Sequence, residues 1–345
     1  MATERHHVAT DAATRTPATD ERTMRAIVQH AYGDAGVWSL TRTARPEIGD
    51  NEVLVRVRAA GLDRGTWHLM TGLAYPIRLV SGLRTPKNPV PGLDVAGTVV
   101  KTGSAVTRFA EGDEVFGISR GSFAEYAAAR EDKLARKPAN ISWAQAAVVP
   151  VSAITALRAL TNSGRVQPGQ KVLITGASGG VGSYAVQLAK ALGAEVTAMA
   201  STAKLDLVRS LGADHVIDYT RDDFADGTRH YDLIIDIAGN PSLARLRRAL
   251  TPTGTAVLVG GEQGGNITGG LGRTLRAMIV GPFIRQRLAM AFPKEHFSDI
   301  ERVGELIEAG KVTPSLDRSY PLEQAPEAMR HLVDGKVRGK VAITI

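Results

Sequence analysis

The chain contains no cysteine among its 345 residues. Disulfide bonds and thiolate-held metal ions are therefore excluded. It also lacks any apolar run of the about 18 residues that a membrane-spanning helix needs. Residues 1–23 lack the apolar core of a signal peptide, so we interpret them as a disordered tail, with folding beginning near Met24. We expect a cytoplasmic protein without a membrane span.

The chain is basic, with 42 Lys and Arg against 35 Asp and Glu and a net charge of +7. A basic balance can indicate nucleic-acid binding. Here the Lys and Arg residues are scattered along the sequence rather than gathered in runs. This pattern favours a surface that attracts an anionic cofactor. We therefore expect no nucleic-acid partner.

A glycine-rich segment gives the clearest functional signal. Residues 171–190 read KVLITGASGGVGSYAVQLAK, an apolar run typical of a strand followed by a glycine turn and a helical pattern. Ala177, Gly179 and Gly182 occupy the positions of the G-x-G-x-x-G pattern, with Ala in the first. Gly179 lets a pyrophosphate approach the backbone, and Gly182 lets the helix pack closely on the strand. Because the helix N-terminus then presents free N–H groups to the phosphates, the segment predicts a dinucleotide site.

The segment after the next predicted strand indicates which dinucleotide binds. NAD sites place Asp or Glu about 20 residues beyond the first glycine, where it binds the ribose 2′-OH. Here residues 200–204 read ASTAK, and the first carboxylate is Asp206. The hydroxyls of Ser201 and Thr202 can donate to a 2′-phosphate and Lys204 can pair with its charge, so NADP is expected. In a competing interpretation, Ser201 or Thr202 is a helix N-cap, and one hydroxyl can serve both purposes.

The pattern of the chain changes near Val148. Before it, short alternating runs bounded by Gly and Pro are typical of half-buried strands, at residues 53–57, 94–101 and 113–117. After it, strands alternate with helices, which predicts a parallel sheet with helices on both faces. The expected helices are 153–160, 203–211, 300–309 and one from Leu322, and the expected strands are 172–174, 196–200, 215–219, 233–237, 256–259 and 341–345. The last helix and strand are short for a domain of their own, so we expect them to return to the first domain.

Residues 69–91 form a long segment rich in Gly and Pro. A loop of this length inside a domain is usually functional, and we expect a substrate or cofactor lid.

From about Met24 to Ile345 the chain resembles the medium-chain dehydrogenase/reductase superfamily. The motifs that carry the resemblance fall in the family's order: VLVRVRAAGLD, PGLDVAGTVV, RFAEGDEVFG, GSFAEYAA, LITGASGGVG, LGADHVIDY and RGKVAITI. The zinc-free quinone oxidoreductase-like branch, which includes the reticulon-4-interacting type, is the most similar. The resemblance implies an α/β fold in which a GroES-like β-rich catalytic domain (residues 24–147 and 293–345) joins a Rossmann doubly wound parallel-sheet domain (148–292), with the active site between them.

Zinc-dependent members of the family carry a catalytic Cys and a Gly-His-Glu segment. In this chain these places read Asp63 and Gly92-Leu93-Asp94. Zinc needs three or four N, S or O ligands in tetrahedral reach, which these positions cannot supply. We interpret His68, the histidine near the expected cleft, as a packed or solvated residue, and we expect no metal.

The resemblance also implies which residues contact the cofactor. Thr155 matches a residue on the nicotinamide side, and Gly260 follows the fifth strand near the nicotinamide ribose. Lys340 in the closing motif is a further candidate. Tyr219 matches a residue at the adenosine end, although a strand-end aromatic without a role is an equal interpretation. The pyrophosphate turn and the 2′-phosphate pocket are expected to comprise Ser178, Gly179, Gly180 and Val181, and Ser201, Thr202 and Lys204.

Without zinc, an alcohol lacks the Lewis acid that stabilises its alkoxide, so reduction of an electrophilic acceptor is favoured. We expect NADPH-dependent hydride transfer to a quinone or an α,β-unsaturated carbonyl, with the protein hydrogen-bonding the developing enolate oxygen. Candidate catalytic residues are Asp63, Thr66 and Tyr75. Relatives often have Asn in place of Asp63, and a neutral Asp63 can still donate, whereas an ionised one repels an enolate. The alternatives are a zinc-independent NADP-dependent alcohol dehydrogenase and a non-catalytic NADPH-binding regulatory protein.

Residues 273–293 form an apolar stretch interrupted by Arg. The pattern indicates a helix followed by the last strand of the parallel sheet. The family commonly builds a dimer from that sheet edge, so a homodimer is expected. In the other interpretation, the stretch forms an apolar wall of the substrate site.

Overall fold

The computed structural model describes residues 22–239, 241–260, 271–291 and 296–345. The predicted tail lies outside the described residues as far as position 21, and so does the predicted domain boundary between residues 292 and 293. Within the described residues, no helix is long and apolar enough to cross a membrane.

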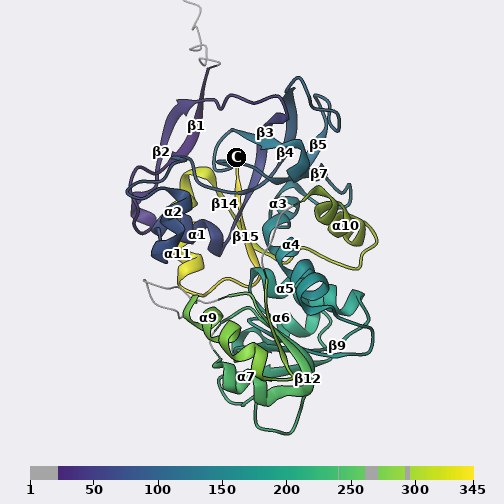
Figure 1. Ribbon diagram of the computed structural model, residues 1–345. Coiled ribbons are helices and arrows are strands. Elements are labelled where there is room, and N and C mark those ends of the chain that lie inside the picture. The colour runs from purple at the N-terminus through teal and green to yellow at the C-terminus, as the bar shows by residue number, and fades with distance from the viewer. Residues whose placement is uncertain (1–21, 240, 261–270, 292–295) are drawn as a thin grey trace, which may run out of the picture.

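In the described part of the chain, one sheet consists of six parallel strands (Figure 1). Their spatial order is β10-β9-β8-β11-β12-β13, which places the first strand in the middle and reverses the winding beside it. This is the strand order of a doubly wound dinucleotide fold, so the predicted Rossmann sheet is confirmed. The strands are β8 (Lys171–Thr175), β9 (Glu195–Ala200), β10 (His215–Asp218), β11 (Tyr231–Asp236), β12 (Leu250–Leu258) and β13 (Arg287–Met290).

Helices cover both faces of this sheet, which is why the apolar run of β8 is buried on successive residues rather than on alternate ones. The first helix begins at Pro150, three residues before its predicted start, because proline suits the first turn, where its missing N–H is not needed. The predicted helix at 203–211 consists of a 3-10 turn, Thr202–Lys204, followed by a short helix. The helices are α4 (Pro150–Arg158), α5 (Gly180–Ala191), α6 (Leu205–Ser210), α7 (Leu243–Ala249) and α9 (Leu271–Val280).

The other half of the structure is rich in β-strands, as the sequence predicted. Its main sheet has the order β14-β15-β3-β4-β5-β7, with β6 paired to β3. The strands are β3 (Glu52–Leu62), β4 (Asp94–Thr102), β5 (Glu114–Ile118), β6 (Tyr126–Arg130), β7 (Leu134–Arg136), β14 (Leu316–Pro321) and β15 (Lys340–Thr344), and β1 (Thr23–Val28) and β2 (Ser39–Ala44) form a separate ribbon. The helices are α1 (Arg64–Thr71), α2 (Arg78–Ser81), α3 (Trp143–Ala147), α10 (Phe297–Glu308) and α11 (Ala325–Val333).

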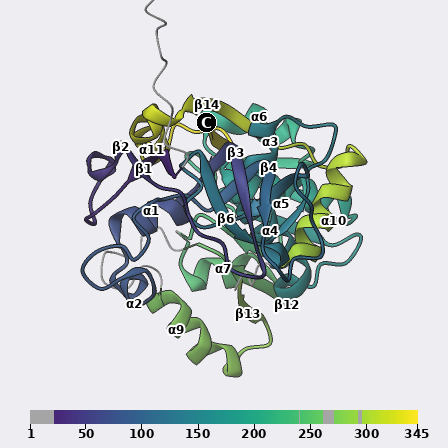
Figure 2. The ribbon, with the colours of Figure 1, turned by 90° about the horizontal axis from the view of Figure 1, so that it is seen from above.

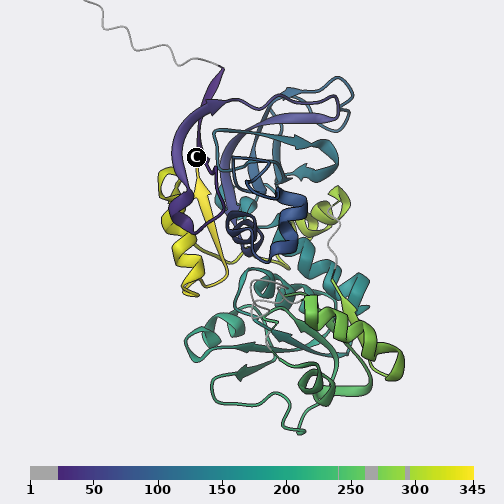
Figure 3. The same ribbon diagram turned by 60° about the vertical axis from the view of Figure 1, so that its left-hand side comes forward.

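The C-terminal segment returns to the N-terminal half. β15 runs antiparallel to β3, with Val341 opposite Leu62. A hydrophobic cluster joins Trp38 near β2 to Tyr320 and Met329 of the closing segment, and Figure 3 shows α11 beside the N-terminal ribbon. The position of the domain boundary at 147 and 148 stays a prediction.

One continuous core connects the two halves. Its buried residues include Ala59 and Phe116 of the β-rich half, as well as Val172 and Ala185 of the parallel-sheet half. Helices α3 and α4 lie between the two sheets in Figure 1, and their alanines are buried in this core. The glycine turn and the ends of β3 and β4 are therefore held in a fixed relation.

The predicted loop over residues 69–91 contains more regular structure than expected. Helix α1 continues to Thr71 and stops at Gly72, whose φ of 64° is a left-handed conformation that suits glycine. A 3-10 turn, Tyr75–Ile77, and α2 follow.

Gly182 packs against the glycine turn so closely that a side chain cannot fit. A Cβ there would lie 2.1 Å from the carbonyl oxygen of Gly176. We expect Gly182→Ala to destabilise the fold by about 1–3 kcal/mol, because backbone must move to relieve the overlap. Thermal unfolding followed by circular dichroism measures this. Gly272→Ala is the control, since a Cβ at this helical position has no heavy atom within 4 Å, and an equal loss in both variants would contradict the packing argument.

Candidate functional site

The glycine turn follows β8 and leads into α5. Gly176 has a φ of 66° and makes the tight turn. The left-handed residue is therefore one position before Ala177, the residue that the sequence analysis assigned to the first position of the glycine pattern. A Cβ on Gly179 would have only an ordinary contact, 3.4 Å from the Gly176 carbonyl oxygen. The missing side chain at Gly179 is therefore not needed for internal packing, and it leaves the backbone open to a phosphate at the start of α5.

Lys340 reaches this turn from the opposite half of the molecule. The backbone N–H of Gly339 donates to the carbonyl oxygen of Ser178 at 2.9 Å. A Cβ on Gly180 would lie 2.9 Å from Cδ of Lys340, so the lysine stem passes directly over that glycine. Strand β15 thus places Lys340, which is 2% exposed, against the N-terminus of α5.

Two carboxylates face the buried ammonium group of Lys340. Its Nζ lies 3.5 Å from Oδ2 of Asp94 and 4.0 Å from Oδ2 of Asp63. Asp94 is fully buried, and its Oδ1 accepts the backbone N–H of Val151 at 2.9 Å. Oδ2 of Asp63 is buried and accepts no hydrogen bond from the described residues. We call Asp63, Asp94 and Lys340 the charge cluster.

The charge cluster has one more carboxylate than ammonium groups. Burial raises the pKa of Asp94 to about 7, against the lowering effect of the Lys340 charge, and the Asp63 charge adds to the rise. The cluster can therefore hold or release one proton near neutral pH. Burial and the Asp94 charge also raise the pKa of Tyr184 well above its usual value, and its hydroxyl donates to the carbonyl oxygen of Val148.

Asp63 is held in place by the start of α1. Its Oδ1 accepts the backbone N–H of Thr66 at 2.7 Å and the hydroxyl of the same residue at 3.0 Å. Thr66 is 1% exposed, so its side chain orients Asp63. Because Oδ1 serves as the helix cap, Oδ2 is left to face Lys340.

Tyr75 lies elsewhere, on the 3-10 turn before α2. Its side chain is 47% exposed, and the guanidinium of Arg78 lies 4.9 Å from the ring centroid. His68 has its Nδ1 2.6 Å from the carbonyl oxygen of Leu73 and packs edge-on against Trp67. Of the three predicted catalytic residues, the structure joins Asp63 to Thr66 and leaves Tyr75 at the surface.

Lys204, the residue predicted to bind a 2′-phosphate, contacts the C-terminal segment. Its Nζ donates to the carbonyl oxygens of Gly335 and Val337 at 2.8 and 2.7 Å. Burial and the charge of Arg338 lower the pKa of Lys204. Arg338 donates to the carbonyl oxygen of Ala203 at 2.7 Å. Sequence reasoning missed this second cation, although it stands in the closing motif two residues before Lys340.

The hydroxyls near Lys204 differ in their partners. Thr202 donates to the carboxylate of Asp218 at the end of β10, which also accepts the Thr220 hydroxyl. The side chain of Ser201 makes no capping hydrogen bond, so neither hydroxyl acts as the helix N-cap that was the competing interpretation. Tyr219, at 57% exposure, lies on the surface beside this group.

The remaining predicted cofactor contacts lie around the C-terminal ends of β8 and β12. Thr155 is 9% exposed, and its hydroxyl donates to the carbonyl oxygen of Val151 within α4. Ser178 is 8% exposed and Val181 is half-buried. Gly260 approaches the residue that follows β11 so closely that a Cβ would lie 1.9 Å from the carbonyl oxygen of Ile237. Each of these assignments stays a prediction.

The residues at the former ligand positions do not fit a zinc ion. Among the described residues, no group of three His, Cys, Asp or Glu side chains could hold a metal. Lys340 already places a positive charge beside Asp63 and Asp94. A divalent cation would be repelled by the ammonium group and would find only two carboxylates, so no step of the chemistry is assigned to a metal.

The described part of the stretch at 273–293, which ends at residue 291, contains most of α9, a 3-10 turn and β13 at the edge of the parallel sheet. Arg273 forms an ion pair with buried Asp236, whose other oxygen accepts the Thr175 hydroxyl. Four large apolar side chains point to solvent here: Leu275, Met278, Ile279 and Phe283. In Figure 2, α9 and α2 lie on the same side of the molecule, and α2 and its flank also expose Leu79, Val80 and Leu83.

The pKa of Asp94 predicts a pH dependence of stability. Between about pH 4 and 7 the folded state holds a proton on Asp94 that the unfolded chain has released, so the free energy of unfolding falls as pH rises through this window. Asp94→Asn keeps an oxygen for the Val151 N–H but cannot ionise. We expect urea unfolding across this range to show a loss of stability in the wild type that the variant lacks, and parallel curves would contradict the assignment.

Comparison with known proteins places this geometry in a family. A model of the alcohol dehydrogenase GroES-like domain matches residues 49–139, and a model of the zinc-binding dehydrogenase domain matches residues 211–343. The chain is 32% identical to a chloroplastic quinone-oxidoreductase homolog of Spinacia oleracea, over 93% of this chain and 98% of the relative. It is 34% identical to a chloroplastic NADPH-dependent alkenal/one oxidoreductase of Arabidopsis thaliana, over 93% of this chain and 79% of the relative.

A solved structure agrees with these matches. The quinone oxidoreductase from Coxiella burnetii superposes with a TM-score of 0.82 at 30% sequence identity, covering 94% of this chain and 99% of the other. Three findings agree: the pairing of a GroES-like half with a parallel-sheet half, the glycine turn, and relatives that match over most of their length. The chain belongs to the medium-chain dehydrogenase/reductase superfamily, in its quinone oxidoreductase-like branch.

Proposed function

We propose that the protein is an NADPH-dependent oxidoreductase that reduces quinones or α,β-unsaturated carbonyls without a metal. Relatives named as a quinone oxidoreductase homolog and an NADPH-dependent alkenal/one oxidoreductase support this assignment. The observation that carries it is the charge cluster, which puts a proton-holding group beside the glycine turn at the place of the family's zinc ligands. Such a group suits protonation of an enolate better than stabilisation of an alkoxide.

The residues present fit a phosphorylated dinucleotide. The open backbone at Gly179 and the free N–H groups at the start of α5 would hold the pyrophosphate. Lys204 and Arg338 lie together beyond β9, where a 2′-phosphate would meet the Lys204 ammonium and the Arg338 guanidinium, which also pairs with Asp206 at 2.6 Å. When bound, the cofactor supplies the hydride.

Asp63 is the proposed contact to the substrate oxygen. It is 7% exposed, the largest exposure in the charge cluster, and its Oδ2 is not occupied by a hydrogen bond. The proton that the cluster holds on Asp94 can reach the developing enolate by way of this oxygen, and solvent then replaces it. Lys340 lowers the cost of the carboxylate that remains, and Thr66 keeps the carboxyl group oriented.

An activity assay tests the assignment. We expect oxidation of NADPH, followed at 340 nm, in the presence of a panel of quinones and enones. Asp63→Asn should keep the cap on α1, because Asn also accepts the Thr66 N–H, and should lower kcat by about 10²–10⁴-fold if the carboxyl supplies the proton.

Two results would contradict this function. Tight NADPH binding without turnover across the panel would favour a non-catalytic NADPH-binding protein. Oxidation of alcohols with NADP⁺, in the absence of enone or quinone reduction, would favour a zinc-independent alcohol dehydrogenase.

Cofactor preference tests the 2′-phosphate pocket separately. In Lys204→Gln we expect KM for NADPH to rise about tenfold, because a charge-assisted contact to phosphate is lost, whereas KM for NADH stays unchanged. Steady-state kinetics with both cofactors measure the difference. An equal rise for NADH would show that Lys204 acts only by fastening the segment at Gly335 and Val337.

The homodimer expected from the sequence stays part of this proposal. β13 is the last strand on its side of the parallel sheet, and the exposed apolar side chains of α9 lie next to it. The cytoplasmic location also stays a prediction, since relatives include proteins named as chloroplastic.

A further inference from the structure

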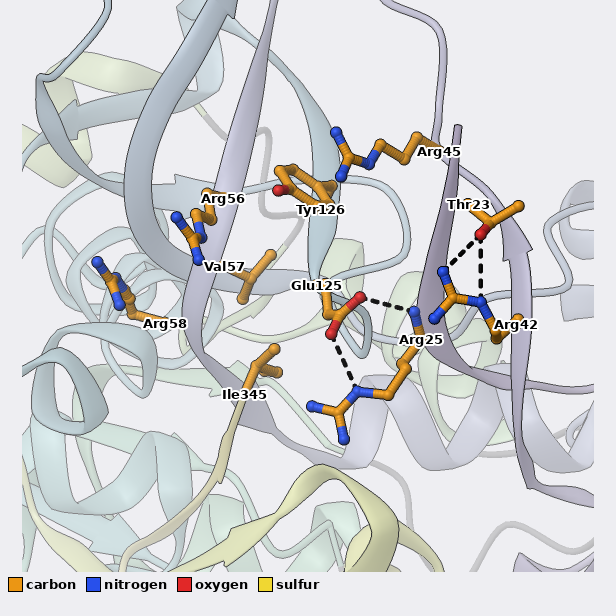
Figure 4. A pocket seen from close by; sticks show the side chains of 10 residues that line it. All are labelled: Thr23, Arg25, Arg42, Arg45, Arg56, Val57, Arg58, Glu125, Tyr126 and Ile345. Atoms are coloured by element: carbon orange, nitrogen blue, oxygen red, sulfur yellow. Dashed lines mark hydrogen bonds and ion pairs between the residues drawn. The ribbon is translucent and has the colours of Figure 1, made fainter. Parts of the chain in front are cut away.

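An arginine-rich groove lies on the β-rich half, away from the charge cluster (Figure 4). It has a volume of about 440 Å³ and is bordered by the β1–β2 ribbon, Arg45, β3 and β6. None of the residues assigned to the dinucleotide or to the charge cluster lines it. Of the described residues that line it, five are arginines and one is an acidic residue, Glu125.

The fold gathers arginines that are scattered in the sequence. Arg25 and Arg42 are directly opposite each other in the register of the β1–β2 ribbon. Arg56 and Arg58 lie two residues apart on β3 and therefore point to the same face of the strand. Like charges that face one another across a ribbon destabilise it, and an anion beside them offsets the repulsion.

The groove does not neutralise its own charge. Glu125 accepts the side chain of Arg25 at 2.9 Å and its backbone N–H at 2.8 Å. Among the described residues, Arg42 donates to the neutral hydroxyl of Thr23, at 2.6 Å from Nη2, and its charge helps to lower the pKa of Glu125. Among the described residues, neither Arg56 nor Arg58 forms an ion pair. The charge that remains can be balanced by an anionic ligand.

Arg45 adds a further cation to the rim. Its guanidinium carbon lies 4.1 Å from the ring centroid of Tyr126, and its Nε is buried without an acceptor among the described residues. Stacking on the ring orients the planar guanidinium, which is the geometry that binds a phosphate or carboxylate by two parallel hydrogen bonds.

The arrangement favours a small ligand over a polymer. In Figure 4, Arg56 and Arg58 lie on one side of Glu125 and Arg42 lies on the other. A continuous polyanion crossing the groove would pass the Glu125 carboxylate, whereas two separate phosphate groups would avoid it. The volume is within the range of sites for small molecules.

We propose that this groove binds a compact oligophosphate, a small ligand that carries two or more phosphate groups. The phosphates contact the Arg56–Arg58 side and the Arg42–Arg45 side. The site is independent of the proposed oxidoreductase activity.

Isothermal titration of the full-length protein with inorganic triphosphate tests the proposal. NADP⁺ is kept at saturation so that the probe cannot be counted at the dinucleotide site. We expect one triphosphate per chain at moderate salt, and binding about a hundredfold weaker in Arg56→Gln/Arg58→Gln, since each lost charge-assisted contact weakens binding about tenfold. Lys101→Gln/Arg302→Gln removes the same charge from exposed positions outside the groove and should bind like the wild type.

Three results would overturn the proposal. They are the absence of triphosphate binding, equal weakening in both double variants, and binding only to anionic phospholipid vesicles or single-stranded DNA used as competing probes. Unchanged thermal unfolding of Arg56→Gln/Arg58→Gln shows that any loss of binding is not a loss of fold.

Discussion

The rest of the site depends on a lysine that is buried among carboxylates. An ammonium group removed from water is costly unless opposite charges face it, and here Asp94 and Asp63 do so at 3.5 and 4.0 Å. These contacts fix the start of β15 against β4 and the start of α1. They also require glycine at position 180, because the lysine stem passes over it. One buried charge thus influences the protonation of Asp94, the geometry of the glycine turn and the attachment of the C-terminal segment.

The sequence predicted those parts of the fold that local patterns specify. The glycine turn, the alternation of strands and helices in the parallel-sheet half and the β-rich half follow from residue periodicity and from glycines at fixed offsets. The exact turn was placed one residue late, at Ala177 instead of Gly176, because the pattern alone does not show which residue has positive φ. The regular structure within 69–91 was missed because α1 and α2 are short.

Side-chain pairing across long stretches of chain could not be predicted in the same way. Lys340 meets Asp94 from 246 positions away, and Lys204 meets the carbonyl oxygen of Gly335 from 131 positions away. Lys340 and Lys204 stand out in the sequence, but the residues that they contact depend on how β15 pairs with β3. The arginine groove could not be predicted for the same reason. Its arginines are single residues in the sequence, and only the pairing of the strands brings them together.

The pairing of β15 with β3 has a consequence for biosynthesis. Val341 must find Leu62 across almost the whole chain, a contact of very high sequence separation. On the ribosome, the β-rich half is made first but lacks β15, an interior strand of its sheet, until that strand emerges, whereas β8 to β13 are already complete. Until then, the edge of β3 that pairs with β15 stays unpaired in the N-terminal half. The parallel-sheet half is therefore the one able to fold first. A truncation that removes β15 would leave this edge open to pairing with other chains, so aggregation of nascent protein is the hazard that this topology carries.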